Sequence, residues 1–260
     1  MIITLATDFG YNDPFVGVMK GVIAGINPRA QVVDLTHGIP PQDLLAAALI
    51  LRHSVCYFPR GTVHVVVVDP GVGSARRPLL IESDGRYLIG PDNGVLSLAL
   101  QGKPPNSVIH LSNPVYHLQP ASATFHGRDV FSPVAAYLSL GIPPPAFGEP
   151  IDNFISLALP PVVKTQRWID GEILYIDGFG NLFTNIRDHD VAGLAPDVLT
   201  IRLGAISIHG LAANYSAARE GEFVALVNSW GLLEIAINKG SARQLTQANI
   251  GDKVQVALSS

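Results

Sequence analysis

The sequence predicts an α/β N-terminal domain with a mainly parallel central sheet, followed by a C-terminal antiparallel β-barrel domain. Val65 to Val68 are four β-branched residues in a row, which is typical of a strand buried on both faces of a parallel sheet. In the first 160 residues, apolar runs of strand length alternate with segments of helical spacing. From about residue 167 the runs are short and are bounded by Gly, Asn and Asp. We therefore expect domains at residues 1–160 and 167–260, joined by a proline-rich linker.

The elements of the N-terminal domain follow from their patterns and their breakers. A strand over 2–6 leads to a helix over 16–26, and a strand over 32–35 leads to a helix that begins after Asp43. Asp84-Gly85 predicts a hairpin turn between the strands at 79–82 and 87–89. Further helices are expected at 95–100 and 132–140. The expected strands of the second domain are 171–177, 182–186, 198–203, 223–228 and 253–258.

The composition excludes several classes of partner and site. The chain of 260 residues carries a net charge of −4 and no run of Lys and Arg, which argues against a nucleic-acid or membrane-surface partner. Cys56 is the only cysteine, so neither an intrachain disulfide nor a cysteine zinc site can form. No apolar run approaches the roughly 20 residues that span a bilayer, and residues 1–6 do not resemble a signal peptide. We expect a cytoplasmic protein.

Five carboxylates are predicted to lie at strand ends or helix starts. Ligands of open α/β sheets bind at the carboxyl ends of the strands. One interpretation is a metal-dependent phosphoesterase, because hard cations prefer carboxylate ligands. The other is a site for a cationic ligand with ribose hydroxyls. Composition does not choose between them. Asp13 has a simpler alternative role as an N-cap ahead of Pro14. The five residues are Asp8, Asp13, Asp34, Asp69 and Asp92.

A nucleotide-cofactor site is not supported. Gly71-Val72-Gly73 begins like a dinucleotide fingerprint, but Arg76 occupies the place of the third glycine, which permits close packing of helix and strand.

Several motifs together resemble one family. The chain resembles the S-adenosyl-L-methionine (SAM) hydrolases that form adenosine, also called SAM hydroxide adenosyltransferases, which are related to the fluorinase and to the SAM-dependent chlorinase. The resemblance covers nearly the whole chain in the same order. The motifs are Thr7-Asp8-Phe9-Gly10, Asp69-Pro70-Gly71-Val72-Gly73 with Arg76, Gly90-Pro91-Asp92-Asn93-Gly94, Phe125-His126-Gly127-Arg128-Asp129, Asp177-Gly178-Phe179-Gly180-Asn181-Leu182-Phe183-Thr184-Asn185 and Asn228-Ser229-Trp230-Gly231-Leu232-Leu233-Glu234.

The resemblance implies a reaction and an assembly. The hydrolytic branch carries an Asp–Arg–His set, which this chain has as Asp69, Arg76 and His126. Halogenating relatives replace these polar residues, so water is the expected nucleophile, attacking C5′ of SAM. The resemblance further implies a homotrimer with sites between subunits, no cofactor and no metal. A halogenase-like adenosyltransferase and a non-catalytic SAM or adenosine binder are the alternatives.

The resemblance also implies substrate contacts. Asp8 would bind the ribose hydroxyls, and Asp177 would meet the methionine ammonium. Ser229 would hold the methionine carboxylate with the help of the backbone at Trp230. Asn181 would contact the adenine edge. The remaining expected contacts are Phe183 and Tyr215, which would pack against the base, together with Asp13 and Glu234; Phe15 replaces a fluorinase serine near Asp13.

Overall fold

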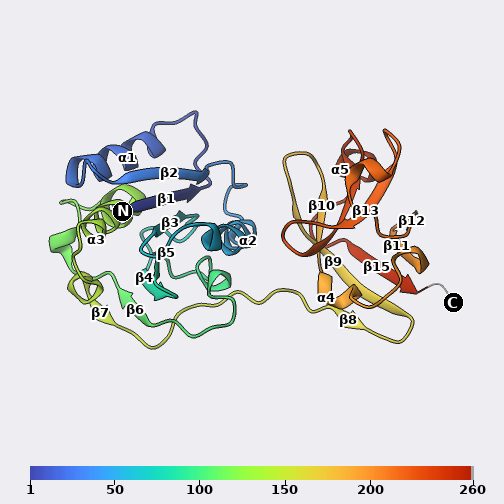
Figure 1. The fold of residues 1–260 in the computed structure, drawn as a ribbon. Coiled ribbons are helices and arrows are strands. Elements are labelled where there is room, and N and C mark those ends of the chain that lie inside the picture. The colour runs from blue at the N-terminus through green and yellow to red at the C-terminus, as the bar shows by residue number, and fades with distance from the viewer. Residues whose placement is uncertain (259–260) are drawn as a thin grey trace. The chain divides into compact units, whose positions relative to one another are not determined.

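The computed structural model describes residues 1–258, which divide into two compact units, Met1–Leu157 and a second that begins at Ala158. The predicted fold class is confirmed: the first unit is built on a mixed sheet with parallel strands, and the second on a nearly closed antiparallel sheet (Figure 1). Within the described residues, no helix combines the length and apolar character needed to cross a membrane.

The sheet of the first unit has the order β2-β1-β3-β5-β4-β6-β7. The strands β1, β2, β3 and β5 run parallel to one another. The remaining neighbours in the sheet, β5 with β4, β4 with β6 and β6 with β7, pair antiparallel. Asp84 and Gly85 both have positive φ, as a tight turn between β4 and β5 requires. The bounds are β1 (Ile2–Thr7), β2 (Gln31–Thr36), β3 (Val63–Val67), β4 (Pro78–Ser83), β5 (Arg86–Pro91), β6 (Ser107–His110) and β7 (Glu149–Pro150).

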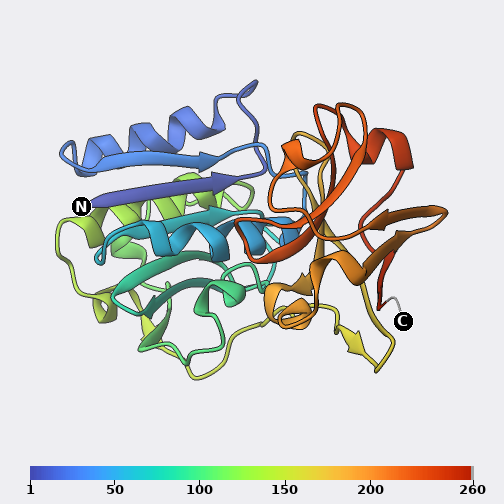
Figure 2. The same ribbon diagram turned by 45° about the vertical axis from the view of Figure 1, so that its right-hand side comes forward.

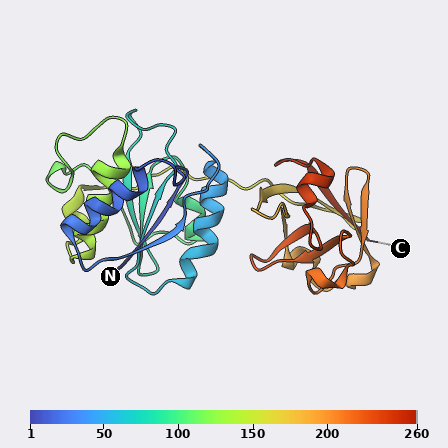
Figure 3. The same cartoon turned by 90° about the horizontal axis from the view of Figure 1, so that it is seen from above.

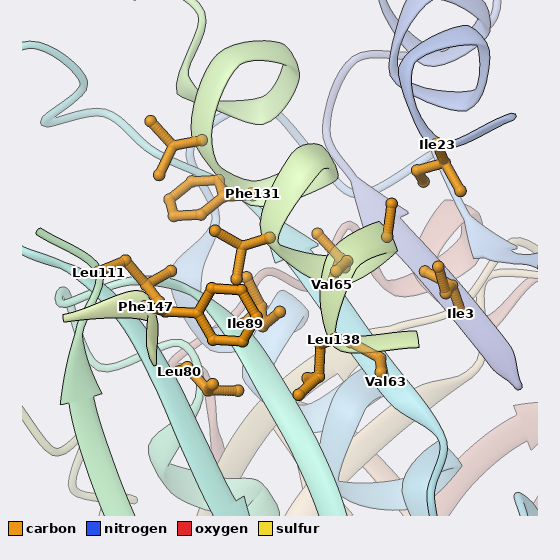
Figure 4. Close-up of a cluster of buried hydrophobic side chains, with 14 of the residues drawn as sticks. Ile3, Ile23, Val63, Val65, Leu80, Ile89, Leu111, Phe131, Leu138 and Phe147 are labelled. Carbon is orange, nitrogen blue, oxygen red and sulfur yellow. The ribbon is translucent and has the colours of Figure 1, made fainter. Parts of the chain in front are cut away.

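Helices cover both faces of this sheet (Figures 2 and 3). On one face, α1 (Phe15–Ile26) and α3 (Ser132–Ser139) pack on each other and on the central strands, while α2 (Leu44–Ser54) lies on the other face. Every residue of β3 is buried, and the burial of Val65 to Val68 is the one predicted from their uninterrupted apolar run. Figure 4 shows the core between the sheet and α1 and α3, in which Phe131, Phe147 and Leu80 are fully buried.

Helix boundaries show where the expectations were wrong. Asp43 caps α2 by accepting a hydrogen bond from the amide of Ala46, as predicted. Asp13 does not cap α1, because Pro14 itself holds the N-cap position. Residues 95–100 form a 3-10 turn from Ser97 to Leu100 rather than an α-helix. Ahead of α3 lies a π-helical turn, Gly127–Phe131, a feature often found at functional sites.

The second unit is an antiparallel sheet of order β12-β11-β15-β9-β10-β14-β13, with β8 paired to β9. Its inward-facing aliphatic side chains form one core, which includes Ile173, Leu182 and Ile235. The sequence pattern missed β8, β12 and β14. The bounds are β8 (Val163–Lys164), β9 (Trp168–Ile176), β10 (Leu182–Arg187), β11 (Leu199–Leu203), β12 (Ile206–His209), β13 (Phe223–Val227), β14 (Leu232–Ile237) and β15 (Lys253–Leu258), with the short helices α4 (Asp188–Val191) and α5 (Ala242–Thr246).

Candidate active site

The parallel register of the first unit brings two predicted site residues to one edge of the sheet. Thr7 at the end of β1 pairs with Val67 at the end of β3, so Asp8 and Asp69 both follow the carboxyl ends of neighbouring strands. Both line a cavity of about 430 Å³, together with Phe9, Phe125 and His126. This is the place where open α/β sheets bind ligands.

The turn after β3 folds Arg76 back onto Asp69. Val72 donates its amide proton to the carbonyl oxygen of Asp69, and Ser74 donates to that of Gly71, so successive turns reverse the chain. Gly73 has φ +77°, and a Cβ there would lie 2.3 Å from the carbonyl oxygen of Ala123. Only glycine fits at this position, where the turn packs against the segment that leads to His126.

Asp69, Arg76 and His126 form one connected cluster. The Nε of Arg76 donates to Oδ1 of Asp69 at 3.0 Å, and a second short contact joins its Nη2 to Oδ2. The same Nη2 lies 2.7 Å from Nδ1 of His126. The side chains of Asp69 and Arg76 are only 5% and 8% exposed, and the guanidinium also lies over the Phe131 ring. Such a buried bidentate ion pair fixes the geometry of all its members.

Arg76 determines the protonation of His126. A guanidinium can only donate, so Nδ1 of His126 must accept, and the imidazole proton resides on Nε2. Burial lowers the pKa of His126, and the charge of Arg76 lowers it further. His126 is therefore a neutral imidazole that offers an N–H donor. Arg76 itself is not among the residues that line the cavity, and acts from behind Asp69 and His126.

The five carboxylates do not form a single cluster. Asp34 pairs with Lys20, and Asp92 accepts hydrogen bonds from Arg77 and from the amide of Ile155. Asp13 is exposed on the loop ahead of α1 and does not line the cavity. Among residues 1–258, no three His, Cys, Asp or Glu side chains are placed to hold a metal ion.

The other predicted residues lie in the second unit, where most of them line a cavity of about 630 Å³. Tyr215 donates to Oε1 of Glu234 at 2.9 Å, and Nδ2 of Asn228 donates to Oε2 at 3.0 Å. Burial raises the pKa of Glu234, and the nearby charge of Asp177 adds to this effect. The lining residues are Asp177, Phe179, Asn181, Phe183, Tyr215, Asn228, Ser229, Glu234, Ile237, Lys239 and Gly240.

Asp177 and Asn181 also build the turn on which they lie. Oδ1 of Asp177 accepts from the amides of Phe179 and Asn181, while Oδ2 accepts from Nδ2 of Asn181 at 3.0 Å. This holds the Phe179 ring 80% exposed at the rim of the cavity. The sequence reasoning missed Phe179 as a site residue, although it lies between two residues that were named.

Trp230 supports the cavity wall without lining it. Its ring stacks on Tyr175 and meets Phe183 edge to face at 5.2 Å. Its amide donates to Oδ1 of Asn228, so the backbone N–H that was expected to help bind a carboxylate already has a partner. Asn228 was not predicted; it holds both this turn and Glu234.

Two family models match the chain. The N-terminal domain model of the SAM hydroxide adenosyltransferases matches residues 3–148, and the C-terminal domain model matches residues 171–255. The chain belongs to the SAM hydroxide adenosyltransferase family. It is 40% identical to the (R)-S-adenosyl-L-methionine hydrolase of Thermus thermophilus over 92% of each chain. It is 27% identical to the fluorinase of an Actinoplanes species over 91% of each chain.

Solved structures agree with this family assignment. The crystal structure of an uncharacterized conserved protein from Thermotoga maritima has a TM-score of 0.92 and 33% identity, covering 99% of this chain and all of that one. A conserved hypothetical protein from Thermus thermophilus has a TM-score of 0.78 and 37% identity, covering 98% of both chains.

Proposed function

We propose that this member of the SAM hydroxide adenosyltransferase family hydrolyses SAM to adenosine and L-methionine. Four relatives at 34–40% identity are named (R)-S-adenosyl-L-methionine hydrolase. The observation that carries the proposal for this chain is the buried Asp69–Arg76–His126 cluster, two of whose members line a cavity beside Asp8.

The reaction needs a positioned oxygen nucleophile, because the leaving group is already good. When the water oxygen bonds to C5′, the electrons of the C5′–S bond pass to sulfur, and the sulfonium becomes the neutral thioether of methionine. One proton is released for each SAM. Holding the water within about 3–3.5 Å of C5′, in line with the breaking bond, supplies several kcal/mol of the rate enhancement.

Each member of the cluster has a distinct task in this step. Arg76 only donates and Nδ1 of His126 is occupied, so Asp69 is the member with lone pairs left to accept the proton of the water. His126 presents Nε2–H to the developing hydroxide. Arg76 supplies positive charge and keeps the other two in place. Its buried Nη1 has no hydrogen-bond partner within residues 1–258.

The substrate contacts and the assembly are part of the proposal. Asp8 binds the ribose hydroxyls, and the second-unit cavity takes adenine and methionine through Asn181, Phe183, Asp177 and Ser229, with Tyr215 and Glu234 beside them. Neither cavity alone holds all of these residues. We propose a homotrimer, in which one subunit completes the site of the next. No cofactor and no metal take part, and the enzyme acts in the cytoplasm.

A direct assay tests the proposal against its alternatives. Purified protein mixed with SAM should release adenosine and methionine in equal amounts. Formation of a 5′-chloro- or 5′-fluoro-nucleoside in the presence of halide would favour the halogenase. Binding of SAM without turnover would favour the non-catalytic binder.

A further inference from the structure

A buried histidine lies directly behind the loop that carries Asp8. His37 follows β2, and its side chain is fully buried. Its Nδ1 is 2.8 Å from Oγ1 of Thr7, which is also fully buried, and its Nε2 is 3.0 Å from Oδ1 of Asp34. No local pattern indicates this role, because a lone histidine after a strand is usually a turn residue.

His37 holds the chain on both sides of Asp8. Its side chain contacts Thr7, the residue before Asp8, and its carbonyl oxygen accepts the amide proton of Gly10 at 2.8 Å. Oγ1 of Thr7 also accepts the amide proton of Phe9 at 3.2 Å. Asp8 therefore lies in the segment from Thr7 to Gly10, and His37 contacts both ends of this short arc.

The far side of the imidazole faces a carboxylate. Nε2 of His37 lies 3.0 Å from Oδ1 of Asp34, although neither atom makes a geometrically formed hydrogen bond within residues 1–258. Asp34 accepts from Lys20 at 2.6 Å and from the Tyr11 hydroxyl at 3.2 Å. The imidazole therefore lies between Asp34 on β2 and Thr7 on β1, so a shift of β2 would also move Thr7.

A bulge in the sheet creates this contact. Leu5 pairs with Asp34, but Ala6 pairs with Thr36, so Leu35 is an extra residue in β2. The shift places His37 opposite Thr7 at the end of β1. Bulges often redirect a side chain next to an active site.

We propose that His37 is a positioning residue that sets the Asp8 carboxylate for the two ribose hydroxyls of the substrate. The inference rests on the proposed function, because it takes the ligand of Asp8 to be a ribose. Asp8 already accepts the amide proton of Gln42 at 2.9 Å through Oδ2, so its remaining lone pairs have a fixed direction. A small movement of the arc would misdirect them. The binding of ribose hydroxyls would then weaken, with the water-activating cluster unchanged.

The test compares adenosine with 2′,3′-dideoxyadenosine, by calorimetry on the full-length protein. The wild type should prefer adenosine. His37→Gln keeps an amide near the place of Nε2 but loses the contact to Thr7, and should reduce the preference about five- to tenfold, the effect of one misplaced hydrogen bond. His37→Asn keeps a polar atom near the place of Nδ1 and should retain the preference. With SAM, His37→Gln should raise KM and leave kcat within about twofold, as expected for the loss of uniform binding.

A second pair of variants and a matched control complete the experiment. Thr7→Val should act like His37→Gln, and Thr7→Ser should retain the wild-type preference, which keeps the test valid if a histidine variant fails to fold. The control is His64→Gln. His64 contacts Thr4 through Nδ1 at the same 2.8 Å and is equally buried, but Thr4 lies earlier on the same strand. This variant should leave the hydroxyl preference unchanged.

The outcomes separate the two proposals. A wild type that neither binds adenosine nor cleaves SAM overturns the proposed function. The role of His37 alone is overturned if the wild type cleaves SAM but does not prefer adenosine to the dideoxy compound. It is also overturned if His37→Gln and Thr7→Val both keep the wild-type preference. An equal loss of preference in His64→Gln would show that the effect is general destabilisation and would also overturn the role of His37.

Discussion

Replacing Asp69 by Asn should separate the chemistry from the packing of the site. The substitution keeps the shape of the side chain but removes its charge. The Arg76 side chain, 8% exposed, then loses its anionic partner. Breaking a buried ion pair costs about 3–5 kcal/mol in stability. We expect about 3 kcal/mol, because the amide oxygen of Asn can still accept one of the two hydrogen bonds from Arg76.

The rate of SAM cleavage should fall by more than the loss of folding stability alone would explain. Without the carboxylate, the water loses its acceptor and Arg76 loses what keeps it beside His126. A positioned group of this kind contributes about 10²–10⁴-fold, so the rate of SAM cleavage in a single turnover should fall within that range. SAM affinity should barely change. Arg76→Ala and His126→Ala should behave similarly, and the triple variant should be little slower than the slowest single one.

Asp92→Asn provides the matched control. Asp92 is as buried as Asp69 and pairs with Arg77, the residue next to Arg76, but it does not line the cavity. It should lose stability without losing the single-turnover rate of the folded enzyme. The assays are rapid-quench hydrolysis, calorimetric SAM binding and urea unfolding. The reasoning is refuted if Asp69→Asn cleaves SAM at the wild-type rate, or if its affinity and rate fall together.

Three further outcomes are expected. Hydrolysis of SAM should be unaffected by EDTA, measured by chromatography of adenosine; complete loss of activity on chelation would favour metal chemistry. Light scattering should give the mass of a trimer, and a fully active particle with the mass of one chain would contradict the shared site. Burial lowers the pKa of His64 from 6.5 to about 4, so the unfolded chain binds a proton that the folded chain does not between these values. Stability should therefore decline as pH falls from 6.5 to 4, by about 3 kcal/mol from this residue. His64→Asn should flatten that part of the urea-midpoint profile.

The fold was predictable because its signals are local. The apolar run from Val65 to Val68, the Asp84-Gly85 turn and the Asp43 cap each act over a few residues, and each is confirmed. The failures occurred where tertiary contacts decide the outcome. Residues 95–100 have an apolar helical pattern, yet they form a single 3-10 turn against α2. The strand β14 is not predicted by its pattern. All six of its residues are buried, so it shows no alternation of polar and apolar residues.

The site was predictable only in part, for a related reason. Motifs named Asp8, Asp69 and His126, and parallel strand ends bring the first two to the same edge of the sheet. Motifs do not show which hydrogen bonds are already used. Asp177 and Asn181 use part of their hydrogen-bonding capacity within their own turn, and the backbone amide of Trp230 donates to Asn228.

The supporting residues are the hardest to find from sequence, because their partners are distant in the chain. Arg76 reaches His126 across 50 positions, and His37 reaches Thr7 across 30. Arg76 only donates, so it forces the proton of His126 onto Nε2, where His126 offers a donor to the cavity. Both ring nitrogens of His37 instead face protein groups, Thr7 and Asp34. That difference in what surrounds each ring, and not the residue type, assigns His126 to the chemistry and His37 to the scaffold.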